Sequence, residues 1–338
     1  MTTGRANTGP GRGPREARPA ATRRWFANGP ETGPRVLVIG ASGFLGTHVH
    51  VRARAAGLDV VTAGRSALPD SRSHFLVDLT DDDPARLAVM LAGLEPDVVI
   101  NCAGATGSDV AALTALNVTG TSALVRALRM TGRSIRLVHL GSAAEYGPSE
   151  HGTTVEETTP PRPTSVYGST KLAATRLVEL GRATGLDAVV LRVFNPVGPG
   201  APDTILPGRV AAEFRRALTR GSVVRLGPLD AVRDFVDVRD IADAAIAAAL
   251  APALAGAVLN IASGSGVLAR TLATEMAAIT GYDGPVHEDS GGSPHSAGLN
   301  WQQGDSYRAE RDLGWRPRYS LRESLTDLWE GRRAAGAA

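Results

Sequence analysis

The chain alternates short runs of β-branched residues with longer amphipathic stretches, and this alternation restricts its fold more than any other feature. Helical patterns at 48–56, 84–91, 110–130 and 169–183 separate the strand-like runs, which are RVLVIG (35–40), DVVTAG (59–64), DVVINCAG (97–104), IRLVHLGS (135–142) and DAVVLRVF (187–194). Strands that alternate with helices of this length form βαβ units, in which helices cover both faces of a parallel sheet. The apolar residues run continuously through the strands, as burial on both sides requires. The sequence therefore predicts an α/β fold with a doubly wound parallel sheet.

The alternation ends near residue 194, where the Pro/Gly-rich segment NPVGPGAPDTILPG (195–208) begins. A helical pattern at 209–219 is followed by short strands. Further helical patterns follow from about 238, at 268–280 and at 321–329, with a strand near AVLNIAS (257–263). We expect residues 35–194 to form the sheet domain. We expect residues 195–330 to form mainly a smaller C-terminal substrate-binding lobe, interleaved with returns to the main sheet. Residues 1–34 lack apolar periodicity and cannot bury enough surface to offset their ordering entropy, which predicts a disordered tail.

Charge and composition exclude several classes of partner. The formal net charge is +2, and much of the basic excess lies in the arginine-rich first 34 residues, so the rest of the chain offers no electrostatic reason to bind nucleic acid. The single cysteine, Cys102, fits a reducing cytoplasm. No apolar run of membrane-spanning length is present, and none follows Arg23-Arg24 as an export signal would require. We expect a cytoplasmic protein without nucleic-acid or membrane partners.

Three glycines follow the first predicted strand, in VLVIGASGFLG. Gly40, Gly43 and Gly46 stand between a strand and a helix with the spacing G-x-x-G-x-x-G. Glycines allow a sharp turn and a close approach to a pyrophosphate, whose charge the helix N-terminus stabilises. A glycine-rich turn without a ligand is the alternative, but the flanking strand and helix favour a dinucleotide site on a Rossmann-type sheet.

The residues after the second predicted strand indicate which dinucleotide is preferred. An NAD site usually carries an acidic residue there, whereas this chain reads Ala63-Gly64-Arg65-Ser66. An arginine can pair with a 2′-phosphate, which favours NADPH while leaving NADH possible. Arg65 could also be a solvated loop residue. Asp78, in VDL (77–79), is placed to accept from the adenine amino group.

The stretch SVYGSTKL (165–172) contains a tyrosine and a lysine four residues apart. On a helix, Tyr167 and Lys171 would project from the same face. An ammonium beside a phenol favours the phenolate, so we expect Lys171 to lower the pKa of Tyr167 below its ordinary value of about 10. Tyr167 would then exchange a proton with a substrate oxygen near neutral pH. The spacing alone occurs by chance in many helices.

Four segments taken in order make the chain resemble the extended short-chain dehydrogenase/reductase superfamily, the sugar-nucleotide epimerase, dehydratase and reductase group. They are GASGFLG (40–46), NCAG (101–104), GSAAEYG (141–147) and YGSTK (167–171), and the resemblance covers about residues 35–330. It implies that Ser142, Tyr167 and Lys171 are catalytic. It also implies a homodimer built on the helices at 110–130 and 169–183. The implied cofactor contacts are Gly40, Ser42, Gly43, Phe44, Leu45, Gly46, Arg65, Ser66, Asp78, Leu79, Cys102, Ala103, Gly104, Tyr167, Lys171 and Phe194.

Within that group, the residues after Ser142 argue against a dehydratase. Dehydratases carry an Asp-Glu pair where this chain has Ala143 and Ala144, and two methyl groups cannot shuttle protons. AEYG (144–147), RVFNPVGPG (192–200) and LDAVRDFVDVRDIADA (229–244) look most like GDP-4-keto-6-deoxymannose reductases. The resemblance places Glu145, Asn195, Arg209 and Arg233 at the substrate, with Arg233 on its pyrophosphate, although Arg233 could instead pair with a neighbouring aspartate. No metal site is expected.

The stretch GGSPHSAGLNWQQGD (291–305) departs from the family, because it lacks the arginine that usually precedes its GD. His295 and Gln302 are the candidate replacements. The alternative is a keto sugar without a nucleotide, such as an amino sugar matched to the acidic HEDSGG (287–292). We expect NADPH-dependent reduction of a keto sugar of deoxysugar or aminoglycoside-type metabolism, such as an NDP-4-keto-6-deoxyhexose. An epimerase with tightly held NAD and a non-catalytic cofactor-binding protein remain the alternatives.

Overall fold

A seven-stranded parallel sheet forms the larger part of the molecule. The computed structural model describes residues 33–66, 73–81, 83–289 and 300–335. The strand order is β10-β6-β5-β4-β1-β2-β3, and every pairing is parallel. The strands are β1 (Arg35–Ile39), β2 (Asp59–Gly64), β3 (His74–Leu76), β4 (Val98–Asn101), β5 (Arg136–Ser142), β6 (Ala188–Val193) and β10 (Val258–Ile261). The order reverses between β1 and β4, which is the Rossmann arrangement with one added strand, so the expected fold class is confirmed.

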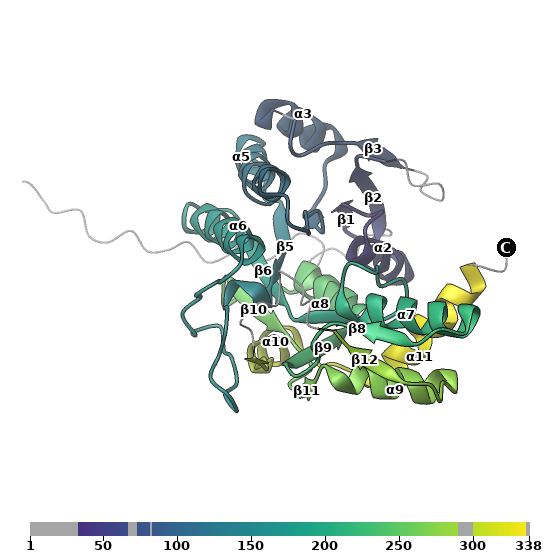
Figure 1. Cartoon of the computed structure of the whole chain (residues 1–338). Helices are drawn as coiled ribbons and strands as arrows, with labels where there is room; N and C mark the ends of the chain where they lie inside the picture. The colour runs from purple at the N-terminus through teal and green to yellow at the C-terminus, as the bar shows by residue number, and fades with distance from the viewer. Residues whose placement is uncertain (1–32, 67–72, 82, 290–299, 336–338) are drawn as a thin grey trace, which may run out of the picture.

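Helices cover both faces of this sheet. Figure 1 shows α3 (Pro84–Leu94), α5 (Thr121–Met130) and α6 (Val166–Ala183) side by side along one face. On the other face α2 (Phe44–Ala55) packs against α8 (Val238–Leu250), and α8 also contacts β4, β5 and β6. Successive strand residues point to opposite faces, so Val36 and Val38 join the core under α8 while Leu37 and Ile39 join the core under α5. Two-sided burial explains the continuous apolar runs of the strands.

Side-chain caps determine where several helices begin. The Asp83 carboxylate accepts from Ala85 N at the start of α3, and Pro84 occupies the first helical position, where its missing N–H costs nothing. Ser165 Oγ accepts from Gly168 N (3.0 Å) and starts α6 two residues before Tyr167. The start of α6 is therefore determined by a local capping residue.

The long helix expected at 110–130 is interrupted. α4 (Val110–Leu113) passes into a π-helical segment, Thr114–Gly120, before α5 begins. In the described part of the chain this run has the length and apolarity of a membrane span. Its buried residues, among them Leu113, Leu124 and Leu128, nevertheless pack into the molecule, and α5 lies between α3 and α6. It is a helix that covers the sheet.

The smaller lobe is built around β9 (Val232–Asp237), which pairs with β7, β11 and β13. The remaining elements of the lobe are β7 (Asn195–Val197), β8 (Val224–Leu226), β11 (Gly266–Leu268), β12 (Val286–Glu288), β13 (Trp301–Gln302), α7 (Leu206–Arg220), α9 (Arg270–Thr280) and α11 (Leu321–Ala335). Phe214, Leu272 and Leu328 belong to its separate core. Figure 1 shows this lobe against the sheet domain, with α11 near the C-terminus.

Parts of the later chain return to the main sheet. β10 joins the main sheet beside β6, and α8 packs on that sheet. Several short elements were not placed from the sequence, among them β3, β9 and α10 (Tyr307–Leu313), because segments of three to seven residues show too little periodicity. The expected tail lies outside the described residues, except for Gly33 and Pro34.

Candidate active site

The predicted site residues follow strands that end at the same edge of the main sheet. Gly40 follows β1, Cys102 follows β4, Ser142 ends β5 and Asn195 comes shortly after β6. Because these strands are parallel, their carboxyl ends meet at one edge, and ligands of such sheets bind where the strand order reverses. Here the reversal lies between β1 and β4.

The turn from β1 into α2 requires glycine. Gly40 has a φ of +78°, and a β-carbon there would lie 2.7 Å from Ala103 N. A β-carbon on Gly46 would overlap the carbonyl oxygen of Gly40. α2 begins directly after Gly43, which makes no side-chain cap, and Ser42 and Gly43 are exposed. The first amides of a helix lack intrahelical partners, so this turn fits a dinucleotide diphosphate.

The residues expected at the adenosine end lie after β2 and β3. Arg65 and Ser66 are exposed after β2, whereas the Leu79 side chain is buried. Asp78 Oδ1 accepts from Thr80 N (3.0 Å) and Thr80 Oγ1 (2.8 Å). These bonds, with a contribution from the charge of Arg65, lower the pKa of Asp78. Asp78 is thus held as a carboxylate with one oxygen committed to its own turn.

Ser142, Tyr167 and Lys171 come together where β5 ends under α6. Tyr167 and Ser142 share a side-chain hydrogen bond. Lys171 Nζ donates to Leu140 O (2.6 Å) and lies 3.8 Å from the position of a β-carbon on Gly104. A β-carbon on Gly168 would overlap Ala144 O, so the glycine after the tyrosine allows α6 to pack closely on the turn after β5.

The pKa of the tyrosine differs from the sequence expectation. Burial raises the pKa of Tyr167, the hydrogen bond with Ser142 opposes this effect, and the negative charge of Glu145 adds to it. Burial also lowers the pKa of Lys171. The expected lowering of the tyrosine pKa by lysine is therefore wrong for the protein by itself. Desolvation is the largest influence on the pKa of Tyr167, and the Lys171 ammonium donates to the Leu140 carbonyl instead.

Sequence reasoning missed Asn117, which lies in the π-helical segment. Its Oδ1 accepts from Ala105 N (2.8 Å), and its Nδ2 donates to Ala105 O (3.1 Å) and to Thr170 Oγ1 (3.1 Å). Asn117 thereby ties the loop after β4 to α6, one residue before Lys171. A buried asparagine inside an apolar helix was the available signal, because buried amides need partners.

Two predicted ligand contacts are core residues. Glu145, expected at the substrate, is fully buried, and both of its carboxylate oxygens accept hydrogen bonds from the protein. Phe194, expected at the cofactor, is also fully buried; its ring packs 6.3 Å from the ring of Tyr146 and fills the space beside Gly304. The side chains of both residues belong to the interior, contrary to the sequence interpretation.

The other expected substrate residues lie on the lobe side of the site. Arg233 is buried on β9, Nη1 donates to Val232 O (2.9 Å), and burial lowers its pKa to about 10. Asn195 donates to Asp234 O (2.8 Å), whereas Arg209 is partly exposed on α7 and its Nε lies 3.5 Å from Asp203 O. Neighbouring carboxylates have other partners: Asp234 accepts from Ser263, and Asp237 pairs with Arg239 (2.8 Å).

The stretches considered as replacements for the missing arginine are only partly described. Gln302 is buried in register with Arg233, and its Nε2 donates to Ala143 O (2.9 Å), so its amide N–H serves the protein interior. Glu288 pairs with Arg270 (2.8 Å) and Asp289 pairs with Arg225 (3.5 Å). These two acidic residues of HEDSGG therefore have arginine partners within the protein. His295 and residues 290–292 lie outside the described part of the chain.

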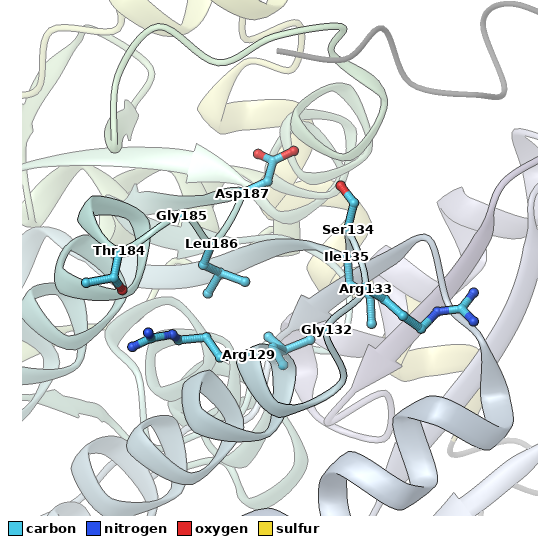
Figure 2. A pocket seen from close by; sticks show the side chains of 10 residues that line it. Arg129, Gly132, Arg133, Ser134, Ile135, Thr184, Gly185, Leu186 and Asp187 are labelled. Carbon is cyan, nitrogen blue, oxygen red and sulfur yellow. The ribbon is translucent and has the colours of Figure 1, made fainter. Parts of the chain in front are cut away.

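A pocket on the described surface lies at the opposite edge of the sheet. Figure 2 shows its lining, which includes Arg129 and Arg133 near the end of α5 and Leu186 and Asp187 before β6. β5 begins beside it at Arg136 and ends at Ser142, a span of roughly 20 Å at strand rise. This pocket is therefore separate from the Tyr167 site. Among the described residues, no group of three His, Cys, Asp or Glu side chains could hold a metal ion.

Comparisons with known proteins agree with this geometry. The model of the NAD dependent epimerase/dehydratase family matches residues 36–262. The dTDP-6-deoxy-L-talose 4-dehydrogenase (NAD(P)(+)) of Kitasatospora kifunensis is 37% identical over 319 residues, 91% of this chain and 99% of that protein. The GDP-6-deoxy-D-mannose reductase of Pseudomonas aeruginosa is 29% identical over 88% of this chain and 98% of that protein.

A solved structure of MoeE5 in complex with UDP-glucose and NAD has a TM-score of 0.78 and 30% identity, covering 89% of this chain and 99% of that one. The resemblance to deoxymannose reductases is thus shared with a talose dehydrogenase of higher identity. The chain belongs to the NAD dependent epimerase/dehydratase family and is an NAD(P)-dependent enzyme of the short-chain dehydrogenase/reductase type.

Proposed function

We propose that the chain is an NADPH-dependent reductase of a 4-keto-6-deoxyhexose attached to a nucleoside diphosphate. The observation that carries the proposal is the assembly of Ser142, Tyr167 and Lys171 at the carboxyl edge of the sheet, next to two alanines. Ala143 and Ala144 provide no acid or base for eliminating water. The site is therefore equipped for oxidoreduction at a carbon bearing oxygen.

The protein residues then have distinct tasks. The bound dinucleotide would supply the hydride that reaches the carbonyl carbon. Tyr167 gives its proton to the carbonyl oxygen, and a pKa raised by burial keeps the phenol protonated for that task. Ser142, hydrogen-bonded to Tyr167, orients the same oxygen. Lys171, held by Leu140 O and lying close to Gly104, is placed to bind the nicotinamide ribose.

The nucleotide handle is supported by Arg233 and by the relatives. Burial lowers the pKa of Arg233, so a diphosphate beside the guanidinium would offset its desolvation. The two curated relatives act on dTDP- and GDP-linked deoxysugars. The exposed Arg65 after β2 favours NADPH by pairing with its 2′-phosphate.

The deciding experiment supplies NADPH or NADH with a set of nucleotide-linked and free keto sugars and follows loss of reduced-cofactor absorbance. We expect NADPH oxidation with an NDP-4-keto-6-deoxyhexose. Tyr167→Phe should lower kcat by roughly 10²–10⁴-fold while NADPH still binds. Tyr307→Phe removes a hydroxyl from the exposed α10 and serves as the matched control.

Other outcomes would refute the proposal. Full turnover in Tyr167→Phe would remove the tyrosine from the reaction. Sugar inversion without added reductant, together with NAD retained through purification, would identify an epimerase instead. Cofactor binding without turnover of any keto sugar would indicate a non-catalytic protein.

A further inference from the structure

Glu145 is a buried carboxylate whose oxygens are both engaged by donors. Oε1 accepts from Ser142 N (2.8 Å). Oε2 accepts from Thr175 Oγ1 (2.8 Å) and from Arg192 Nε (2.7 Å). Three donors, one of them a guanidinium, match the ionised form, which can only accept. Burial raises the pKa of Glu145, and the charge of Arg192 together with these hydrogen bonds opposes that effect, so the partners around the carboxylate favour its charged form.

The surrounding sequence leaves room for this charge. A β-carbon on Gly141 would lie 2.7 Å from Glu145 Oε1, so the strand needs glycine there. The Arg192 guanidinium stacks over the Tyr146 ring at 4.5 Å from its centroid. Buried ion pairs are often less stabilising than well-packed apolar residues, so stability alone does not account for this arrangement.

Glu145 is linked to the reacting residues in two ways. It closes a capping box with Ser142: Ser142 Oγ accepts from Ala144 N while the Glu145 carboxylate holds Ser142 N. Its charge also acts on α6, where it raises the pKa of Lys171 against the lowering effect of burial and adds to the raised pKa of Tyr167.

Apart from Arg192, the other titratable groups near Tyr167 and Lys171 have pKa values shifted toward their neutral forms. Burial raises the pKa of Cys102, after β4, to about 12. Burial and the charge of Lys171 lower the pKa of His139, on β5, well below its usual value. Burial raises the pKa of Tyr146 to about 12, and Arg192 on β6 neutralises the far side of Glu145. Among these groups Glu145 supplies the negative charge.

We propose that Glu145 is a positioning residue of the reductase: held by Arg192 and Thr175, its carboxylate fixes the backbone of Ser142, the hydrogen-bond partner of Tyr167, and supplies a negative charge to the site. This role rests on the proposed function and replaces the expected substrate contact. A ketone reductase needs its phenol protonated as the proton donor, and an anion behind Tyr167 disfavours the phenolate. Glu145 thereby favours reduction near neutral pH.

The test is the pH dependence of the reductase with Glu145→Gln. Without the anion, both the ammonium and the phenol should lose protons at lower pH, because one loses a favourable charge and the other an unfavourable one. The alkaline limb of kcat for reduction should therefore move to lower pH by roughly one unit. Ultraviolet absorbance can follow tyrosinate formation in the cofactor-free protein. Subtracting the titration of the same protein with Tyr167→Phe isolates Tyr167, and its midpoint should also move to lower pH in Glu145→Gln.

Two variants control for disturbance of the packing. Thr175→Val removes a hydrogen bond to the same oxygen, and Arg192→Lys keeps the paired charge, so both retain the carboxylate. Their alkaline limbs should stay at the wild-type pH. An equal shift in all three variants, or no shift in Glu145→Gln, would overturn the proposal.

If Glu145→Gln does not fold, Glu145→Gln/Arg192→Met leaves no unpaired buried charge and should show the same shift. Failure of the proposed function would be recognised separately, because the wild-type enzyme would then not reduce keto sugars at all. The tyrosinate titration needs no substrate and tests the role of Glu145 in that case too.

Discussion

Polar side chains form a buried layer at the carboxyl end of one face of the sheet. Asn101 donates to His139 Nδ1 across β4 and β5 (3.2 Å), and Arg192 occupies the same face of β6 beside Glu145. Buried polar groups are costly unless they are paired. Asn101 makes two hydrogen bonds and Glu145 accepts three, whereas the buried His139 Nε2 has no partner among the described residues. At the scale of single residues, the reacting Tyr167 and Lys171 are thus surrounded by groups with defined protonation states.

Cofactor choice is also decided by single residues. Arg65→Ser should raise the Kd for NADPH roughly tenfold to a hundredfold, because it removes a charge-assisted hydrogen bond worth about 1.5–3 kcal/mol. The Kd for NADH should change little. Fluorescence titration with both nucleotides measures the two constants, and Arg126→Ser on the exposed part of α5 is the control. Equal weakening for both nucleotides would show that Arg65 does not read the 2′-phosphate.

At the scale of elements, the positions of two helices depend on glycines that allow close packing. α2 approaches the turn after β1 through Gly46, and α6 approaches the turn after β5 through Gly168. In both contacts the backbone of the helix lies against the backbone of the turn, at Gly40 for α2 and at Ala144 for α6. A methyl group at either position would push the helix away from the site.

The same substitution in two helices should therefore have opposite effects. Gly46→Ala should destabilise the protein by about 1–3 kcal/mol and weaken NADPH binding, because the new methyl overlaps Gly40 O. Gly93→Ala in α3 meets no atom within 4 Å and should stabilise it by about 0.5–1 kcal/mol. Denaturant unfolding with and without NADPH measures both effects. Stabilisation by Gly46→Ala would contradict the packing described for this turn.

At the scale of the whole molecule, Asp234 links the two sheets. From β9 in the lobe it accepts from Ser263 N (2.8 Å) and Gly264 N (3.0 Å), which follow β10 of the main sheet. It also accepts from Gly304 N (3.1 Å), next to β13. Asp234 therefore ties β9 of the lobe to the end of β10 in the main sheet, and the candidate active site lies between the lobe and that sheet.

Exposed apolar residues on the outer helices indicate where a homodimer would form. Val110, Met130, Val166 and Leu180 are each about half exposed or more on α4, α5 and α6, and we expect this surface to form a homodimer. Leu180→Glu should yield monomers in size-exclusion chromatography with light scattering. Leu218→Glu on α7 of the lobe should leave the dimer intact. A monomeric wild-type protein, or a dimer that persists in Leu180→Glu, would place the interface elsewhere.

Much of the fold could be predicted because its information is local. The strands of the first 194 residues were predicted within a few residues, apart from β3, since apolar runs, turn residues and capping side chains act over short stretches. The glycine turn and the placement of Tyr167 and Lys171 on one helix were likewise readable from spacing. The interruption at Asn117 was not, because a π-helical segment of seven residues is too short to show its period in the sequence.

The sequence alone determined the sheet, the turn after β1 and the helix that carries Tyr167 and Lys171, because each depends on residues close together in the chain. Only the tertiary structure decided that Phe194 and Glu145 point inward, that Gln302 donates to Ala143 O, and that burial raises the pKa of Tyr167. These outcomes depend on desolvation and on partners 30 to 159 residues away in the chain, such as Thr175 for Glu145 and Ala143 for Gln302. No local pattern encodes such distances.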